Sequence, residues 1–512
     1  MPGAFAKSLS FGVFGIEPYQ VTVEVDVTIG QREDSIFQIV GLPEGAVKES
    51  RERVRAAIGN SGFWFPAGRV TANLAPADIR KEGVAFDLPL AVGVLAASGS
   101  LSPDLLGRYA LVGELGLNGE VRPVRGALPL ALGARNAGVS GILVPTDNAP
   151  EAAVVERVQV IPVATLAEAV EFLAGTRPIL PHHPPPFVTE NGQHIPDLAD
   201  VRGQAGARRA LEIAAAGAHN ILMIGPPGSG KTMLARRLPG ILPPMTFEEA
   251  LDVTKIHSIA GLTGRGGLIT NRPFRSPHHT VSHVAMIGGG TLPRPGEASL
   301  AHHGVLFLDE FPEFPRQALE TLRQPLEDGA VTVARAAMTC EFPARFMLCA
   351  SMNPCPCGYR TDPARECRCT PPDVQRYHAR LSGPLLDRID IHIEVPAVKY
   401  QELTRGEPGE PTAVVRERVQ AARQRQLDRF RGRPGLYANA QISGRDLRRW
   451  CRLDDATLAM LERAMGSMGL SARAYDRILR VARTIADMAG KDEIDSEAVS
   501  EAIHYRNLDR RL

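Results

Sequence analysis

A glycine-rich stretch at residues 225–232 is the strongest candidate for chemistry in this sequence. It has the sequence GPPGSGKT and matches the whole pattern G-x-x-x-x-G-K-[ST]. In such a loop the glycines let backbone N–H groups turn toward phosphates, the lysine reaches the β- and γ-phosphates, and the final hydroxyl ligates Mg²⁺. The residues predicted to bind ATP, with Thr232 also a Mg²⁺ ligand, are Gly225, Pro226, Pro227, Gly228, Ser229, Gly230, Lys231 and Thr232.

Two adjacent carboxylates complement this loop. The stretch GVLFLDEFPEF places Asp309 and Glu310 directly after four apolar residues. Asp309 is a predicted ligand of the ATP-bound Mg²⁺, and Glu310 is the predicted catalytic residue that polarises the attacking water. An Asp-Glu pair alone also fits a solvated turn, but the order and spacing of the two motifs support each other.

Both motifs require a rigid frame, and the sequence around them predicts one. Residues 221–224 and 305–308 are apolar runs that indicate buried strands, and a helical pattern follows Thr232. The strand–loop–helix context separates a phosphate loop from a chance glycine-rich turn. We therefore expect an α/β fold with a parallel sheet, in which the loop and the acids share one edge.

Four of the seven cysteines lie in NPCPCGYRTDPARECRC, residues 353–369. The polar segment between the two C-x-C pairs has little to bury, so a hydrophobic core cannot order it and a bound metal would. We expect one structural Zn²⁺ in a closed tetrahedral site. Free thiols or a redox pair are the alternatives, since C-x-C is less typical of zinc than C-x-x-C. The predicted ligands are Cys355, Cys357, Cys367 and Cys369.

Composition limits the function classes. The chain has 512 residues and a net charge of +1, so any attraction to nucleic acid or to an anionic membrane must come from local patches. The N-terminal residues lack a signal-peptide pattern, and no window of about 18 residues is apolar throughout. The other three cysteines, Cys340, Cys349 and Cys451, are scattered, which suits a reducing compartment. We expect a cytoplasmic protein without a membrane partner.

Two proline-rich breaks divide the chain. The stretch RPILPHHPPPF at residues 177–187 indicates a stiff linker, and TRGEPGEPT at residues 404–412 marks a second break. Helical spacing dominates after the second break. The expected segments are an N-terminal domain (1–175), a linker (176–200), an ATPase core (201–400) and a helical lid (401–512).

Nearly the whole chain resembles the YifB/ComM family of magnesium-chelatase-like AAA+ ATPases. The strings that carry this resemblance are GPPGSGKTMLARRLPGILPP, NRPFRSPHHTVS, GVLFLDEFPEF, NPCPCG and RLSGPLLDRIDIHIEV. The resemblance implies that Asn353 is a sensor of the γ-phosphate, that Arg388 is an arginine finger given to a neighbouring subunit, and that Arg473 is a second sensor contacting the nucleotide. A shared site implies a head-to-tail contact that closes into a ring, and the family implies a homo-hexamer.

The N-terminal region resembles the Lon-type protease domain, an α/β fold like domain 2 of ribosomal protein S5. The matching segment RKEGVAFDLPLAVGV has no serine at the nucleophile position, and no lysine occurs between Lys81 and Lys231. Without nucleophile and base the domain is not expected to cleave peptides. We expect it to contact DNA or to support ring assembly.

Two insertions are candidate DNA contacts. They span residues 260–297 and 329–346, and the second indicates a β-hairpin. By analogy with related ring motors we expect Arg272, Arg275 and Arg335 to face a central channel and touch phosphate. Solvated loop charges are the simpler interpretation of each arginine. Neighbouring histidines at 278–279 and 302–303 point apart in regular structure, so chelation is not expected from them.

The resemblance implies an ATP-driven DNA motor, a hexameric helicase that migrates branched DNA during recombination in natural transformation. One alternative is a chelatase-type motor that drives metal insertion into a porphyrin. The other is a non-catalytic scaffold that binds ATP as a switch. Glu310 and Arg388 argue against a pure switch, because a switch has little use for a water-activating acid or a finger.

Overall fold

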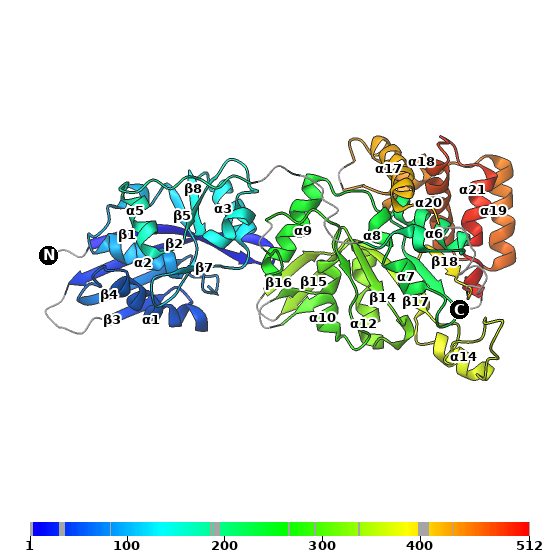
Figure 1. The fold of residues 1–512 in the computed structure, drawn as a ribbon, viewed down its shortest axis with the longest axis horizontal. Coiled ribbons are helices and arrows are strands. Elements are labelled where there is room, and N and C mark those ends of the chain that lie inside the picture. Colours follow the sequence, from blue (N-terminus) through cyan, green and yellow to red (C-terminus); the bar gives the residue numbers. More distant parts are fainter. Residues whose placement is uncertain are drawn as a thin grey trace. The chain divides into compact units, whose positions relative to one another are not determined.

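The computed structural model describes residues 4–29, 36–81, 83–184, 187, 195–264, 267–290, 293–335, 338–397, 409–433 and 435–510. The chain forms two compact units (Figure 1). The first contains residues Met1–Val188 together with Phe247–Ile269. The second contains Thr189–Thr246 together with Thr270–Leu512. Each unit is therefore built from two separate stretches of the chain.

The first unit is built on a seven-stranded sheet of mixed direction in the order β3-β4-β2-β1-β5-β8-β9. Its longest pair, β1 and β2, is antiparallel, whereas β5, β8 and β9 run parallel. The strands are β1 (Ala4–Phe14), β2 (Glu17–Ile29), β3 (Ile36–Val40), β4 (Gly68–Ala75), β5 (Tyr109–Leu111), β8 (Gly141–Pro145) and β9 (Gln159–Val163), with a small hairpin β6 (Glu114–Leu115) and β7 (Val121–Arg122).

Helices complete the first unit. Every residue of α2 is buried, which agrees with its apolar sequence DLPLAVGVLAA. The helices are α1 (Gly45–Asn60), α2 (Asp87–Ala97), α3 (Ala127–Asn136), α4 (Ala149–Ala152), α5 (Leu166–Leu173) and α9 (Phe247–Ala260). Helix α9 follows the glycine loop in sequence but packs in the first unit. Buried Glu151 accepts hydrogen bonds from Leu128 N (2.8 Å), Thr263 Oγ1 (2.9 Å) and Ser258 Oγ, and burial raises the pKa of its carboxyl group.

The second unit contains a five-stranded sheet in the order β11-β14-β17-β10-β18. All of its neighbouring strands are parallel, which confirms the expected α/β class with a parallel sheet. Two strands have the predicted bounds, β10 (Ile221–Ile224) and β14 (Val305–Leu308). The other strands of this sheet are β11 (Phe274–Arg275), β17 (Met347–Met352) and β18 (Ile391–Glu394). Residues of β10, β14 and β17 are buried throughout, as expected for central strands covered on both faces.

The remaining elements of the second unit surround this sheet. One hydrophobic core joins the sheet to α6 and to the C-terminal helices. The predicted hairpin is present as β15 (Ala330–Arg335) and β16 (Met338–Pro343). The helices are α6 (Ala205–Gly217), α7 (Lys231–Ala235), α8 (Leu238–Ile241), α10 (His283–Ile287), α11 (Glu297–Leu300), α12 (Arg316–Thr321), α13 (Arg323–Asp328), α14 (Pro371–His378), α15 (Gly383–Leu386), α17 (Thr412–Arg429), α18 (Gly444–Trp450), α19 (Asp455–Met468), α20 (Ala472–Met488) and α21 (Ser496–His504), with a short pair β12 (Gly288–Gly289) and β13 (Arg294–Pro295). Among the described residues, no helix is long and apolar enough to cross a membrane.

Candidate nucleotide site and arginine finger

The glycine loop connects β10 to α7. Three of its positions, Gly225, Gly228 and Gly230, cannot accept a larger residue. A Cβ on Gly225 would lie 2.1 Å from Val395 O, and Gly228 and Gly230 have φ values of 77° and 88°. These positions therefore require glycine, because the first is sterically blocked and the others adopt a left-handed backbone. Gln204, which the sequence interpretation missed, braces the loop by donating from Nε2 to Ser229 O at 2.6 Å.

Lys231 and Thr232 extend from the loop toward the neighbouring strands. Lys231 Nζ donates to Gly225 O at 2.7 Å and to Asn353 Oδ1 at 3.2 Å. Burial lowers the pKa of its ammonium group, and the carboxylate of Asp309 opposes that shift. Thr232 Oγ1 donates to Asp309 Oδ2 at 2.7 Å. The structure therefore brings together the lysine, the hydroxyl, the acid and the sensor amide that the sequence interpretation had assigned to one site.

Asp309 and Glu310 follow β14 and have different surroundings. Asp309 accepts a hydrogen bond from Ser351 Oγ as well as from Thr232, so its carboxylate is fixed. Glu310 has a left-handed backbone (φ 55°), and its side chain extends to His279, with 3.2 Å between Oε2 and Nδ1. Sequence interpretation missed Ser351 and His279. The signal for Ser351 was a lone polar residue in an apolar strand, whereas the position of His279 depends on the fold.

These residues fit ATP and Mg²⁺. A hydroxyl and a carboxylate in direct contact are hard oxygen ligands of the kind that Mg²⁺ prefers. Ser229 Oγ is buried and has no hydrogen-bond partner among the described residues, so the loop has an unused polar atom. Lys231, Thr232 and Asp309 would hold the phosphates and the metal, and Glu310 and Asn353 would face the reacting group.

Arg388 lies at the opposite edge of the same sheet. It precedes β18, whereas the glycine loop follows the end of the adjacent parallel strand β10. The four residues of β10 span roughly 13 Å at about 3.3 Å per residue. Arg388 Nη1 donates to Pro384 O at 2.7 Å, and Nη2 pairs with Glu327. This pairing lowers the pKa of the Glu327 carboxyl group.

Arg473 lies near Arg388 and not near the glycine loop. Its Nη1 atom is 4.0 Å from the carboxylate of Asp387, and the side chain is 63% exposed. The structure therefore does not bring Arg473 to the phosphate loop of its own chain. It places both arginines at the edge of the sheet where β18 begins.

The three arginines predicted to contact DNA are in different environments. Arg275 forms a bidentate ion pair with Glu297, with distances of 2.7 and 2.8 Å. Arg272 donates to the carbonyl oxygens of Pro243 and His303, both at 2.7 Å. Arg335 ends β15, and its side chain lies outside the described residues. A phosphate would have to displace the internal partners of Arg275 and Arg272. The structure therefore gives no support to these two residues as DNA contacts.

The four cysteines form one cluster. The sulfur of Cys355 lies 3.4 Å from that of Cys357 and 3.6 Å from that of Cys367, and all four sulfurs, including that of Cys369, lie within 4.8 Å of one another. Tetrahedral zinc with Zn–S distances of about 2.3 Å requires S–S separations of roughly 3.8 Å, whereas a disulfide requires about 2.05 Å. The cluster therefore fits Zn²⁺ and is not disulfide-bonded.

The cysteine loop touches the nucleotide site directly. It begins two residues after Asn353, and a Cβ on Gly358 would lie 2.7 Å from the ring of Pro227 in the glycine loop. On the other side, His378 Nε2 lies 3.2 Å from Pro354 O. The loop therefore packs between the phosphate-binding turn and α14.

Comparison with known proteins agrees with this site. Three family models match in sequence order: "Subunit ChlI of Mg-chelatase" at residues 23–148, "Magnesium chelatase, subunit ChlI" at residues 197–403, and "Magnesium chelatase, subunit ChlI C-terminal" at residues 409–506. The chain is 44% identical over 508 residues to competence protein ComM of Haemophilus influenzae, covering 97% of this chain and 96% of that protein. It is 44% identical over 499 residues to the uncharacterized protein YifB of Escherichia coli, with 97% and 96% covered.

A more distant relative is the magnesium-chelatase 67 kDa subunit of Chlorobaculum parvum, 30% identical over 161 residues, which are 31% of this chain and 23% of that protein. Together with the site, these matches define the class of magnesium-chelatase-like AAA+ ATPases. Within this class the chain belongs to the YifB/ComM family, because the identity to both ComM and YifB extends over nearly its full length.

Proposed function

We propose that the protein is an ATP-hydrolysing motor that acts on DNA as a ring of six identical subunits, most specifically as a branch-migration helicase in recombination during natural transformation. The observation that carries the motor proposal is the separation of Arg388 from the glycine loop of its own chain by the length of β10. The link to DNA uptake rests on the relative named competence protein ComM.

The residues at the edge of the sheet that carries the glycine loop have different proposed roles. Bound ATP supplies the phosphoanhydride bond, and Mg²⁺ neutralises charge on its phosphates. Lys231 and the loop bind and orient the phosphates, while Thr232 and Asp309 hold the metal. Glu310 acts as the general base that orients the attacking water. Asn353 contacts Lys231, which binds the phosphates, so Asn353 lies where it can sense the γ-phosphate.

Arg388 has no route to this edge within its own chain, so we infer that it completes the site of a neighbour. An arginine finger supplied by another subunit stabilises charge on the transferred phosphate and typically raises turnover by about 10³- to 10⁵-fold. A contact between one end of each subunit and the other end of the next is head-to-tail, and it closes into a ring. Arg473, beside Asp387, lies on the same surface and is proposed to reach the same neighbouring nucleotide.

The four-cysteine cluster is proposed to hold one structural Zn²⁺. Four thiolates leave no open coordination position, so the metal would order the loop and take no part in hydrolysis. Since Gly358 packs on Pro227, an ordered loop would also fix the glycine loop and Asn353.

The DNA contact is proposed to involve basic side chains other than Arg272 and Arg275. Arg335 remains one candidate. A second is a groove of about 470 Å³ lined by Pro312, Glu313, Phe314, Arg316, Arg376, Ala379 and Arg380. Arg380 pairs there with Glu313 at 2.6 Å, which leaves Arg316 and Arg376 as the candidate phosphate contacts. The groove adjoins the turn that carries Glu310, so phosphate binding would act close to the catalytic acid.

The test is an ATPase assay of the purified protein with branched DNA, with protoporphyrin and Mg²⁺, and with neither. Stimulation by branched DNA, together with fork migration that requires ATP, supports the proposal. Stimulation by protoporphyrin alone would favour the chelatase-type motor, the alternative that the names of the family models suggest. ATP binding without turnover under all conditions would favour the switch. Replacing Arg316 and Arg376 by Gln should reduce the salt slope of DNA binding by about one per phosphate contact.

A further inference from the structure

Asn220 immediately precedes β10 and uses both ends of its amide. Its Oδ1 accepts a hydrogen bond from Leu348 N in β17 at 2.8 Å, and its Nδ2 donates to Arg388 O at 2.9 Å. Leu348 belongs to β17, which ends at Met352, directly before the proposed sensor Asn353. A single side chain therefore joins the phosphate-loop strand, the sensor strand and the backbone of the proposed finger.

The backbone of Asn220 holds the same segment. Its N–H donates to Asp390 Oδ2 at 3.1 Å, and its C=O accepts from Asp390 N and Ile391 N, both at 3.0 Å. Asp390 is buried and also pairs with Arg477 of α20. Although burial opposes ionisation, the charges of Arg477 and His219 hold the pKa of Asp390 well below its usual range. The segment carrying Arg388 is thus fixed by charge-assisted as well as neutral bonds.

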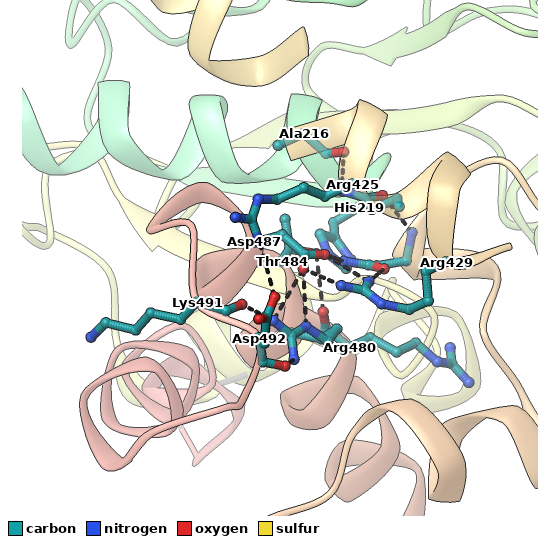
Figure 2. A network of polar contacts seen from close by, with 12 residues as sticks. Ala216, His219, Arg425, Arg429, Arg480, Thr484, Asp487, Lys491 and Asp492 are labelled. Carbon is teal, nitrogen blue, oxygen red and sulfur yellow. Dashed lines mark hydrogen bonds and ion pairs between the residues drawn. The ribbon is translucent and has the colours of Figure 1, made fainter. Parts of the chain in front are cut away.

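His219 extends this arrangement into the C-terminal helices. It is fully buried, with Nε2 2.7 Å from Thr484 Oγ1 and Nδ1 3.6 Å from Asp390 Oδ2. Figure 2 shows His219 and Thr484 in the polar network that includes Asp487. Asn439 Nδ2 donates to both Thr484 Oγ1 (3.0 Å) and Asp487 (2.8 Å). Thr484 lies on α20, the helix whose first turn carries Arg473.

We propose that Asn220 is a positioning residue for the shared active site: it sets the backbone of Arg388 relative to the strands that carry the chain's own phosphate loop and sensor. This inference rests on the proposed function, in which Arg388 acts on the neighbouring subunit. A change at one nucleotide then reaches the finger through β10, β17 and Asn220. Asparagine suits this position because its amide has both an acceptor for Leu348 N and a donor for Arg388 O, whereas aspartate lacks the donor.

The variant Asn220→Asp retains the acceptor and places a carboxylate oxygen against Arg388 O and near Asp390. We expect folded rings that bind a fluorescent ATP analogue within about two-fold of the unmodified protein and hydrolyse ATP about 10- to 100-fold more slowly, since small misplacements of catalytic groups have effects of this size. Asn507→Asp is the matched control, because that asparagine is exposed and contacts His504; it should leave turnover unchanged.

Mixed rings separate a positioning role from a general structural one. Asn220→Asp subunits have an intact phosphate loop, so mixing them with Lys231→Ala subunits, whose fingers are intact, should restore activity. Mixing them with Arg388→Ala subunits should not, since neither partner then supplies a correctly placed finger. Recovery with Arg388→Ala, or no recovery with Lys231→Ala, would overturn the inference.

A mixture of Lys231→Ala with Arg388→Ala tests the proposed function separately. If that mixture recovers activity and the Asn220→Asp mixtures behave otherwise than expected, the inference alone is wrong. If that mixture forms rings but recovers no ATPase activity, both the proposed shared site and the inference about Asn220 are wrong. Asn220→Ser, which removes the link to Arg388 without adding charge, is used in the same mixtures if Asn220→Asp does not fold.

Discussion

The two edges of the five-stranded sheet are built differently. At the edge where the strands end, Lys231 contacts Asn353 and Thr232 contacts Asp309. At the edge where the strands begin, Arg388 is held through its backbone by Asn220, and its guanidinium group contacts Pro384 and Glu327. The first edge gathers the residues of a candidate nucleotide site, whereas at the second edge the described contacts of the Arg388 guanidinium group are with Pro384 and Glu327.

This difference is the basis of the proposal that the active site is shared between neighbouring subunits. A phosphate cradle of this kind binds nucleotide by itself, and in the proposed function the charge that develops during transfer is stabilised by a further cation in addition to Lys231. Because the strand length separates the two edges, we propose that one subunit supplies the cradle and the next supplies the arginine. Variants at the two edges are therefore expected to fail in different ways.

The largest effect is expected at the edge where the strands end. Lys231→Ala should abolish nucleotide binding, because the ammonium group is the main cation of the cradle. Glu310→Gln should bind ATP with near-normal affinity and lose turnover, because it keeps the shape and removes the base. Equilibrium binding and steady-state ATPase assays separate the two outcomes. Turnover of Glu310→Gln close to that of the unmodified protein would exclude Glu310 from the reaction.

The next largest effect is expected at the opposite edge. Arg388→Ala should bind ATP and assemble, yet hydrolyse it about 10³-fold more slowly, since the transition-state charge loses its finger. Arg388→Lys is an informative companion, because it retains the charge without the planar fork. Loss of nucleotide affinity in Arg388→Ala, measured in the same binding assay, would contradict the proposed separation between the two edges.

The edge where the strands end was largely predictable from sequence. The glycine loop and Asp309 follow apolar runs, so strand prediction placed them at one edge, whereas Asn353 was assigned to this site through the family resemblance. Confirmed strand bounds at Ile221–Ile224 and Val305–Leu308 show how strong that signal is. Ser351 and His279 were missed because a single polar residue does not reveal which acid it contacts.

The other edge was not predictable in the same way. Asn220 contacts Leu348 and Arg388, which are 128 and 168 positions away, and none of these contacts has a sequence signature. The charge of Arg275 suggested a DNA contact, but in the fold this side chain pairs with Glu297, which the sequence does not reveal. The sequence divided the chain at its prolines, whereas the structure packs residues 247–269 with the N-terminal unit, through contacts such as those of Glu151. Long-range hydrogen bonds and ion pairs of this kind depend on tertiary structure.

A smaller effect is expected from the cysteine loop. Cys367→Ser together with Cys369→Ser should reduce zinc from about one equivalent per chain to near zero, because two thiolates do not form a closed site. Turnover should fall about 10- to 100-fold through displacement of Gly358 and the glycine loop. Metal analysis of chelator-free protein measures the first outcome. Cys340→Ser, outside the cluster, is the control. Undiminished zinc in the double variant would exclude these sulfurs as ligands.

The smallest effect is expected for Glu327→Gln, which tests how the finger is held. The side chain of Glu327 is 60% exposed and pairs with the guanidinium group of Arg388, whereas Asn220 contacts the backbone of Arg388. Releasing the guanidinium group should raise turnover by no more than about five-fold and lower the free energy of unfolding by less than about 1 kcal/mol, because water screens the pair. Since Arg388 lowers the pKa of Glu327 in the folded chain, this stabilisation is present above the ordinary glutamate pKa and is lost as pH falls below it.

Urea unfolding at neutral pH and near pH 4 measures this difference, which should shrink at the lower pH. Glu410→Gln is the matched control, because Glu410 is similarly exposed and pairs with Arg418, away from the finger. It should show the same small, pH-dependent loss of stability and no change in turnover. A fall in turnover of more than ten-fold in Glu327→Gln alone would mean that the acid presents the finger to the neighbour, and the role of Asn220 would then be shared with a residue on α13.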